Sequence, residues 1–216
     1  MVDLELPTHT PIRVIKLGGS LLDMPDLTPR LDFWLAQQSP MLNLCIVGGG
    51  KSVQKLRDLK GSRDSPVTHW KCIRLMDKNA IVLSQTSNAW AFIDSLKLLP
   101  LDSPTSFIFF GTEDWLQNSI TCLPESWSVT SDSIAVVLAR FVDAKELILL
   151  KSALPPVKKD LEQLMEIDFV DRYFKTAATI ANNPDQLSPC GRVDCVNFRD
   201  NNFPQQQLIF GSDSQD

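Results

Sequence analysis

Residues 12–20 read IRVIKLGGS and residues 44–50 read LCIVGGG. Each stretch begins as a short apolar run typical of a β-strand and ends in glycines. Glycines at the end of a buried strand leave backbone N–H groups pointing outward and let a ligand approach the chain closely. The stretch between the two runs is long enough for a crossover helix, so together they predict a βαβ unit with parallel strands. The alternative is that each glycine cluster forms an ordinary tight turn.

The rest of the chain alternates between apolar runs of strand length and segments with helical spacing. We expect strands at 12–17, 44–47, 106–110, 146–150, 193–198 and 208–210. We expect helices at 27–38, 51–59, 66–98, 132–142, 161–165 and 171–179. Strands that alternate with helices predict an α/β fold in which a mainly parallel sheet carries helices on both faces. The length suits a single domain over residues 1–216.

Composition narrows the class of protein. The formal net charge of −5 gives no broad positive field for nucleic acid, so an anionic ligand would need a local site. We find no apolar run long enough to span a bilayer and expect no membrane partner. The 5 cysteines are an odd, scattered set, which predicts reduced thiols and a cytoplasmic protein. With only 2 histidines, we expect no metal held by protein ligands.

Two familiar glycine motifs are incomplete here. Gly50-Lys51-Ser52 looks like the end of a P-loop, but Cys45 occupies the position where that motif needs its first glycine. Val53 occupies the last position of the only candidate for a dinucleotide-binding G-x-G-x-x-G motif. The sequence therefore disfavours both a Walker site and a dinucleotide site.

Two lysines and an aspartate stand at the ends of these elements. Lys16 lies near the end of the first strand, and Lys151 directly follows the strand predicted at 146–150. A lysine in a buried parallel strand is costly unless its ammonium reaches an anion at the carboxyl end, although a lysine there can also face solvent. Asp132 opens a predicted helix, where serving only as the N-cap is the alternative. With the two glycine clusters, the three residues suit phosphoryl transfer, which needs cations and backbone N–H donors around phosphate oxygens.

These motifs resemble the amino acid kinase family, which includes acetylglutamate, aspartate, uridylate and carbamate kinases. The resemblance begins with VIKLGGS at 14–20 and IVGGG at 46–50. Two more segments, HWKCIRLMDKNA at 69–80 and PESWSVTSDSIA at 124–135, resemble the branch of [5-(aminomethyl)furan-3-yl]methyl phosphate kinases of methanofuran biosynthesis. The resemblance covers roughly residues 12–180.

The resemblance implies a three-layer αβα sandwich around a mainly parallel, eight-stranded sheet. It also implies transfer of the γ-phosphoryl group of ATP to a phosphate or carboxylate, with Mg²⁺ carried by the ATP phosphates. The acceptor would be an aminomethylfuran methyl phosphate, bound by the half at about 12–130, with ATP bound by the half at about 131–212. The alternatives are an acetylglutamate-like or uridylate-like kinase, or a catalytically silent ligand-binding protein with the same fold. Residues 66–98 are more apolar than one surface helix requires, and relatives usually pair through this region, so we expect a homo-oligomer built from dimers.

The resemblance also implies a role for individual residues. Lys16 would bridge the donor and acceptor phosphates, and Asp132 would orient the lysines. The nucleotide phosphates would be bound by Gly18, Gly19, Ser20, Lys151 and Ser152. The acceptor would be bound by Gly48, Gly49, Gly50, His69, Trp127 and Thr130. One departure from the family pattern is that residues 150–156 read LKSALPP, whereas many relatives carry Asp-Gly-Val in their nucleotide pocket here.

Overall fold

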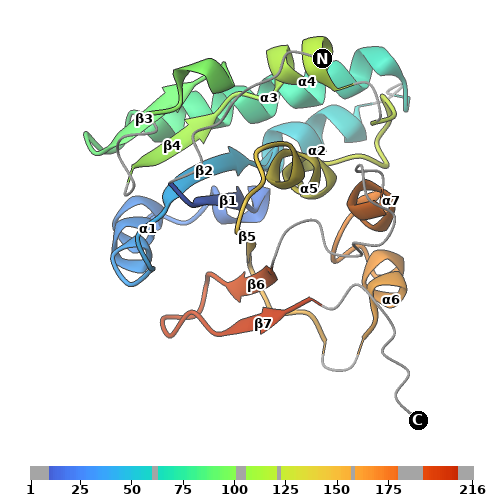
Figure 1. Cartoon of the computed structure of the whole chain (residues 1–216). Coiled ribbons are helices and arrows are strands. Elements are labelled where there is room, and N and C mark those ends of the chain that lie inside the picture. The colour runs from blue at the N-terminus through green and yellow to red at the C-terminus, as the bar shows by residue number, and fades with distance from the viewer. Residues whose placement is uncertain are drawn as a thin grey trace.

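Seven strands form one sheet through the centre of the molecule (Figure 1). The computed structural model describes residues 10–59, 63–100, 106–120, 123–156, 159–179 and 192–208. The strands are β1 (Ile12–Leu17), β2 (Leu42–Val47), β3 (Trp90–Ile93), β4 (Phe107–Phe110), β5 (Glu146–Lys151), β6 (Val193–Asn197) and β7 (Gln205–Gln207). Their order is β3-β4-β2-β1-β5-β6-β7, and all neighbours are parallel except β6 and β7. The described residues thus hold seven strands, where the resemblance implied eight.

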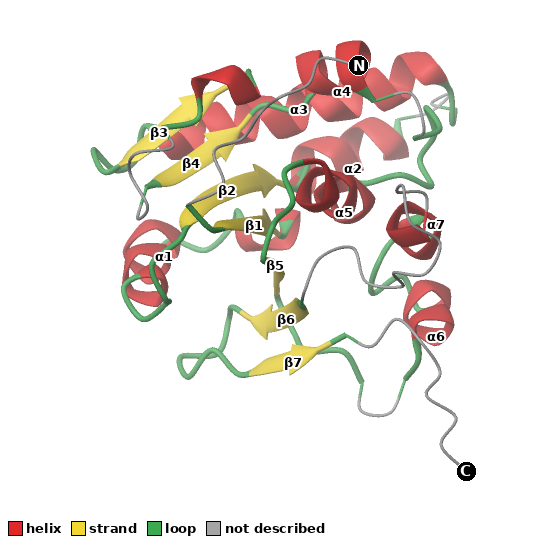
Figure 2. Ribbon diagram, viewed as in Figure 1, coloured by secondary structure: helices red, strands yellow, loops and turns green. Residues whose placement is uncertain are grey.

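Helices cover both faces of this sheet (Figure 2). They are α1 (Leu27–Leu35), α2 (Gly50–Asp58), α3 (Pro66–Ser84), α4 (Glu113–Ser119), α5 (Ser131–Phe141), α6 (Leu161–Glu166) and α7 (Phe174–Thr179), with short 3-10 turns η1 (Gly19–Leu21) and η2 (Leu96–Leu98). Leu31 of α1 belongs to the apolar cluster on one face, together with Ile15 of β1. Leu138 of α5 belongs to the cluster on the other face, together with Val14 of β1. The predicted three-layer α/β sandwich is confirmed.

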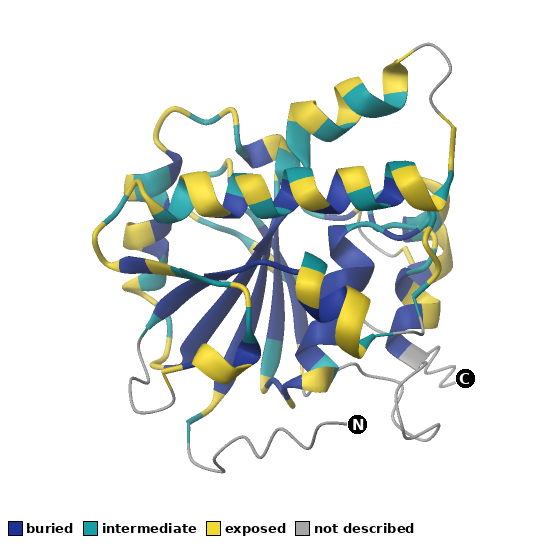
Figure 3. Ribbon diagram, turned by 90° about the horizontal axis from the view of Figure 1, so that it is seen from above, coloured by how far each residue is buried: buried dark blue, intermediate teal, exposed yellow. Residues whose placement is uncertain are grey.

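The layers explain the sequence of the central strands. Every residue of β1 and β2 is buried, which Figure 3 shows as dark strands at the centre of the molecule. Successive side chains of a strand point to opposite faces, and here each face meets a helical layer. Both strands are therefore almost continuously apolar instead of alternating.

The predicted long helix at 66–98 is wrong beyond Ser84, which ends the first 19 of its residues. α3 ends at Ser84, and residues 90–93 form the edge strand β3 instead. The polar residues at 86–88 favour a turn, in which Ser87 Oγ accepts from the backbone N–H of Ala89 at 3.3 Å. The aromatic side chain of Trp90 then gains packing in the sheet, with its ring centroid 5.5 Å from that of Phe107 and 5.5 Å from that of Phe109.

Helix α4 and the last strand also differ from the prediction. The sequence predicted no helix at the position of α4. The last strand is Gln205–Gln207, antiparallel to β6, whereas a strand was expected at 208–210, of which 209–210 lie outside the described residues. Three glutamines give no apolar signal, because β7 lies at the sheet edge with its side chains mostly exposed.

The structure describes three of the five cysteines. Cys45, Cys72 and Cys195 are free and buried, whereas Cys122 and Cys190 lie outside the described residues. Among the helices that can be described, none combines the length and the apolar character needed to cross a bilayer.

Candidate active site

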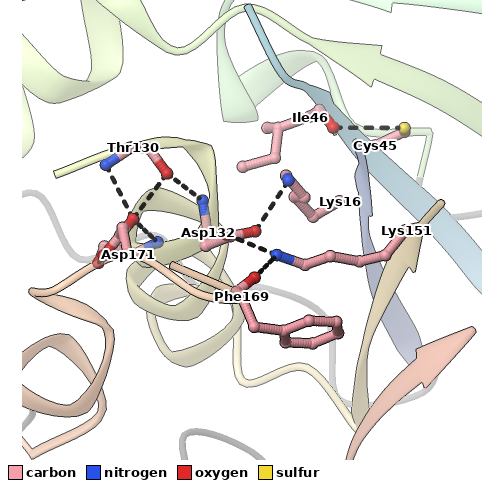
Figure 4. Close-up of polar contacts among 9 residues, drawn as sticks. Lys16, Cys45, Ile46, Thr130, Asp132, Lys151, Phe169 and Asp171 are labelled. Atoms are coloured by element: carbon pink, nitrogen blue, oxygen red, sulfur yellow. Dashed lines mark hydrogen bonds and ion pairs between the residues drawn. The ribbon is translucent and has the colours of Figure 1, made fainter. Parts of the chain in front are cut away.

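Three charged side chains meet at the carboxyl ends of β1 and β5 (Figure 4). The two strands are adjacent and parallel, so Lys16 near the end of β1 and Lys151 at the end of β5 reach the same edge of the sheet. Helix α5 packs against both strands and brings Asp132, its second residue, to that edge. Asp132 Oδ1 lies 2.8 Å from Lys16 Nζ, and Asp132 Oδ2 lies 2.8 Å from Lys151 Nζ. We call these three residues the Lys-Asp-Lys triad.

The triad carries more positive than negative charge in a place that water hardly reaches. The exposed fraction of the side chain is 8% for Lys16, 8% for Asp132 and 12% for Lys151. A buried charge is costly unless it is paired, and one carboxylate neutralises only one of the two ammonium groups. The remaining positive charge favours binding of an anion, such as a phosphate group, at this edge of the sheet.

The surroundings shift the pKa of two of these groups. Burial alone would raise the pKa of Asp132, but the charges of Lys151 and Lys16 outweigh it and bring that pKa to about 2. Burial lowers the pKa of Lys16 below its ordinary value; the charge of Asp132 opposes this shift and that of Lys151 adds to it. Asp132 is therefore a firmly ionised carboxylate that holds cations and is a poor proton acceptor at neutral pH.

The N-cap of α5 is Thr130, and Asp132 has a different function. Thr130 Oγ1 accepts from the backbone N–H of Asp132 at 3.3 Å, while the carboxylate of Asp132 faces the lysines. The alternative that Asp132 serves only as an N-cap is therefore wrong. The hydroxyl of Thr130, which we expected at the acceptor, is engaged in capping and donates to Asp171 at 2.7 Å.

The two glycine clusters pack against each other beside the triad. A Cβ atom on Gly19 would lie 2.3 Å from the backbone nitrogen of Gly50, and one on Gly48 would lie 2.5 Å from the nitrogen of Gly19. Gly50 has a φ of +56°, a conformation that favours glycine. The backbone N–H of Gly18 donates to Leu150 O at 2.9 Å, which ties the first cluster to β5. Glycine is thus required for the two loops to approach this closely.

Ser20, Ser152 and Trp127, which the resemblance assigned to the nucleotide and the acceptor, have no described contact with the charged groups of the triad. Ser20 and Ser152 are exposed, and the carbonyl of Ser20 accepts from Arg199 Nη2 at 2.6 Å. Trp127 donates its backbone N–H to Asp64 Oδ1 at 2.7 Å, and the guanidinium of Arg57 lies 5.4 Å from its ring centroid. Ser20 and Trp127 thus have separate partners, none of which belongs to the triad, whereas Ser152 directly follows Lys151 in the chain.

His69 lines a cavity of about 450 Å³ between α3, α4 and the start of α5. Its Nδ1 lies 3.0 Å from Ser126 O. Burial lowers the pKa of His69, although the carbonyl of Ser126 opposes that shift. His69, Gln117 and Glu125 supply polar groups to this cavity, whose wall also carries apolar side chains such as Trp70 and Ile134. Trp127 and Thr130 do not line this cavity.

Sequence reasoning missed three groups around the site. Asn79 Nδ2 donates to Gly48 O at 3.0 Å and to Gly49 O at 3.3 Å, and so holds the second glycine cluster. Phe169 accepts from Lys151 Nζ through its carbonyl, and its ring centroid lies 4.9 Å from that nitrogen. Asp171 accepts from the first turn of α5. Asn79 follows Asp77 in the segment that carries the family resemblance, but residues 169–171 follow an apolar stretch with no local sign of this contact.

Comparison with known proteins gives a match in structure only. No protein-family model matches the sequence, and no curated protein matches it. The structure is similar to that of UMP kinase from Ureaplasma parvum, with a TM-score of 0.54, 12% identity, and coverage of 89% of this chain and 92% of that chain. It is also similar to UMP kinase from Bacillus anthracis, with a TM-score of 0.53, 12% identity, and coverage of 93% and 99%. At this identity the likeness shows the fold, which is the mixed α/β fold of the amino acid kinases.

Proposed function

We propose that this protein is an ATP-dependent kinase that transfers the γ-phosphoryl group to an acceptor that is already ionised, a phosphate or a carboxylate. The observation that carries the proposal is the buried carboxylate of Asp132 between the ammonium groups of Lys16 and Lys151. Two glycine loops lie next to it. The backbone N–H groups of Gly18 and Gly48 already donate to Leu150 O and Leu17 O, so the donors left for phosphate oxygens would be those of Gly19, Gly49 and Gly50. The fold shared with two UMP kinases agrees with the same chemistry.

The charges of the site indicate what each residue does during transfer. The bond between the γ-phosphorus and the bridging oxygen of ATP breaks, an acceptor oxygen bonds to that phosphorus, and ADP leaves with the electron pair. Negative charge spreads over the transferring oxygens, so Lys16 stabilises it by bridging the donor and acceptor phosphates and Lys151 by contacting the nucleotide phosphates. Asp132 keeps both lysines in position. Gly18 and Gly19 hold the transferring group, and Gly48–Gly50 hold the acceptor.

The same charges favour an ionised acceptor over an alcohol. An alcohol needs a general base near the reacting oxygen. Asp132, with a pKa of about 2 and both oxygens bound to ammonium groups, cannot serve as one at neutral pH. A phosphate or carboxylate oxygen needs no such base. The acceptor half at about 12–130 and the ATP half at about 131–212 would meet at the triad.

Magnesium fits this site as a companion of ATP. Within the part of the chain that the structure describes, no group of three or more His, Cys, Asp or Glu residues could hold a metal ion. A cation bound to the phosphates of ATP would supply further positive charge during transfer. The protein's own contribution to charge neutralisation is the lysine pair.

Two acceptors follow from different observations. The segments at 69–80 and 124–135 favour an aminomethylfuran methyl phosphate, whose ring suits the cavity lined by His69 and Trp70. The two similar structures are UMP kinases, which makes UMP the second candidate.

We also propose a dimer or a multiple of dimers. Of the apolar residues at 66–98, Ile73, Met76 and Trp90 are buried in the core, which leaves Val67, Ile81, Val82 and Leu98 exposed for a subunit contact.

The test is ADP release from Mg-ATP in the presence of a panel of acceptors. The panel contains the aminomethylfuran methyl phosphate, UMP, acetylglutamate and carbamate, with Asp132→Asn as the inactive control. We expect turnover that depends on one phosphate or carboxylate acceptor and is lost in the control. ATP binding without ADP release on any acceptor would identify a silent ligand-binding protein, and absence of ATP binding would overturn the kinase proposal.

A further inference from the structure

We propose that Asp171 is the positioning residue of the Lys-Asp-Lys triad: its carboxylate fixes the first turn of α5 and thereby holds Asp132 between the two lysines. This inference rests on the proposed kinase function and adds a residue to its machinery. Asp171 lies between α6 and α7, outside every element that carries the triad.

The first step of the argument is the set of donors that reach Asp171. Its Oδ2 accepts from the backbone N–H of Thr130 at 2.8 Å, from Thr130 Oγ1 at 2.7 Å and from the backbone N–H of Ser133 at 3.0 Å. Its Oδ1 accepts from Ser133 Oγ and from the backbone N–H of Tyr173 at 3.1 Å. Thr130 and Ser133 flank Asp132 on both sides, so one carboxylate fixes the turn that carries it (Figure 4).

The second step is that the same segment also holds Lys151. Phe169, two residues before Asp171, accepts from Lys151 Nζ through its carbonyl, and its ring lies against the same ammonium group. Residues 169–171 therefore contact both partners of the ion pair between Asp132 and Lys151. A helix cap that served α5 alone would not need this second contact.

The third step concerns charge. Lys16 is faced by Asp132 of α5, Lys151 of β5 and Asp171. The charges of all three triad residues and of Asp194 also reach Cys195 of β6. The negative charge of Asp171 raises the pKa of Lys16, against the larger lowering by burial. Loss of that charge should therefore move the pKa of Lys16 to a lower value. A buried carboxylate that lies away from the triad would leave this pKa unchanged, so the shift reports that the charge of Asp171 reaches Lys16, while kcat reports the positioning.

Asp77 provides a matched control in the same chain. It also lies outside the helix that it caps, and its Oδ1 accepts from the backbone N–H of Thr112 at 2.8 Å and from Thr112 Oγ1 at 3.1 Å. Its Oδ2 accepts from the backbone N–H of Glu113 at 2.9 Å, at the start of α4. Burial raises the pKa of both carboxylates, of Asp77 as of Asp171. Asp77→Asn thus removes a comparable buried cap without touching the triad.

The experiment compares Asp171→Asn with Asp77→Asn. We measure thermal unfolding, kcat and KM with Mg-ATP and the acceptor, and the pKa of Lys16 in the unliganded protein by ¹⁵N NMR of lysine Nζ, assigned with Lys16→Arg. Misplacement of a catalytic group by about an ångström costs on the order of 10²-fold in rate, so we expect Asp171→Asn to lower kcat by about 10- to 100-fold with little change in KM. We expect a lower pKa of Lys16 in Asp171→Asn only, and normal kcat in Asp77→Asn.

The outcomes separate this inference from the kinase proposal. Equal losses of kcat in both variants, or an unchanged pKa of Lys16 in Asp171→Asn, would overturn the positioning role. If no acceptor is turned over, the kinase proposal fails by itself, and an unchanged pKa of Lys16 in Asp171→Asn would still overturn the role of Asp171. If Asp171→Asn does not fold, Ser133→Ala removes one donor and keeps the carboxylate. It should lower kcat at unchanged KM and leave the pKa of Lys16 in place, and an unchanged kcat would contradict the inference.

Discussion

The two ends of strand β1 both bury a positive charge, but they surround it differently. At the amino end, the guanidinium of Arg13, 1% exposed, contacts Glu146 Oε1 at 2.5 Å, Asn43 Oδ1 at 2.8 Å and Ser39 Oγ at 3.1 Å. At the carboxyl end of the same strand, Lys16 shares the carboxylate of Asp132 with a second lysine. At the amino end Arg13 has the carboxylate of Glu146 to itself among the ion pairs of the described residues, whereas at the carboxyl end Lys16 and Lys151 share the carboxylate of Asp132.

This difference separates a structural charge from a functional one. A buried ion pair whose remaining hydrogen bonds are satisfied can be retained in a fold without any ligand. An excess buried charge destabilises the folded protein and is compensated only when a counter-ion binds. The amino end therefore fastens β1 to its neighbours β2 and β5, and the carboxyl end is prepared for an anion.

The largest effect is expected from Lys16→Ala. If Lys16 stabilises charge that develops on the transferring group, kcat should fall on the order of 10²–10³-fold, and KM should change much less. Folding should survive, because Asp132 keeps Lys151 as a partner. Steady-state kinetics and thermal unfolding of the purified variant check both statements.

The matched change at the other end is Arg13→Met, and we expect the opposite pattern. Removal of the guanidinium leaves Glu146 partly buried without its partner, which costs on the order of 3 kcal/mol of stability. The kcat of the folded variant should equal that of the wild type. If Lys16→Ala were the less stable and Arg13→Met the less active of the two, the comparison between the two ends would be wrong.

Asp132→Asn should give the next largest effect. The amide keeps the shape of the side chain but not its charge, so two buried ammonium groups lose their counter-ion and kcat should fall on the order of 10²-fold. The melting temperature should fall as well, and inorganic phosphate or ATP should restore much of it by supplying the missing negative charge. Thermal unfolding with and without phosphate measures this, with Arg13→Met as the control that phosphate should not rescue.

The charged residues of the site were predictable because of where they stand in the chain. Lys16 and Lys151 follow apolar strands, and parallel strands place their carboxyl ends at one edge, so their approach follows from topology. The resemblance also implied that Asp132 orients the lysines, and the structure pairs its carboxylate with both ammonium groups. That pairing depends on how α5 packs against β1 and β5, which no local pattern encodes.

Asp171 and β3 show what sequence reasoning could not find. Asp171 was the first residue of a predicted helix, where an acidic residue suggests a local cap. In the structure it caps α5, and this contact depends on the tertiary arrangement of α5 and the segment before α7. Likewise, the residues at 90–93 continue the helical spacing of α3, but pairing with β4 outweighs that local preference.

A smaller effect concerns acid stability. The pKa of Asp132 is lowered from 3.8 to about 2 in the folded protein, so the ionised form stabilises the fold above the unfolded pKa. This contribution, about 2 kcal/mol, is lost as pH falls from about 4 to about 2. Denaturant unfolding across this range should show a steeper loss of stability for the wild type than for Asp132→Asn. Equal slopes would mean that the triad does not hold Asp132 in its ionised form.

The smallest effect should come from Lys51→Ala. This variant tests whether an exposed lysine beside a glycine loop contributes to stability or to catalysis. Lys51 follows Gly50 as the lysine of a P-loop would, yet its side chain is 79% exposed, and its Nζ lies 3.4 Å from Asp23 Oδ2. An exposed ion pair of this kind contributes little, because water and salt screen both charges. We expect the melting temperature to stay unchanged and kcat/KM to remain within about twofold of the wild type. A large loss of kcat would show that Lys51 takes part in the reaction because it lies beside the glycine loop. Unchanged kinetics would show instead that a lysine at this edge of the sheet contributes to the reaction only when it is buried and paired with the carboxylate of Asp132, as Lys16 and Lys151 are.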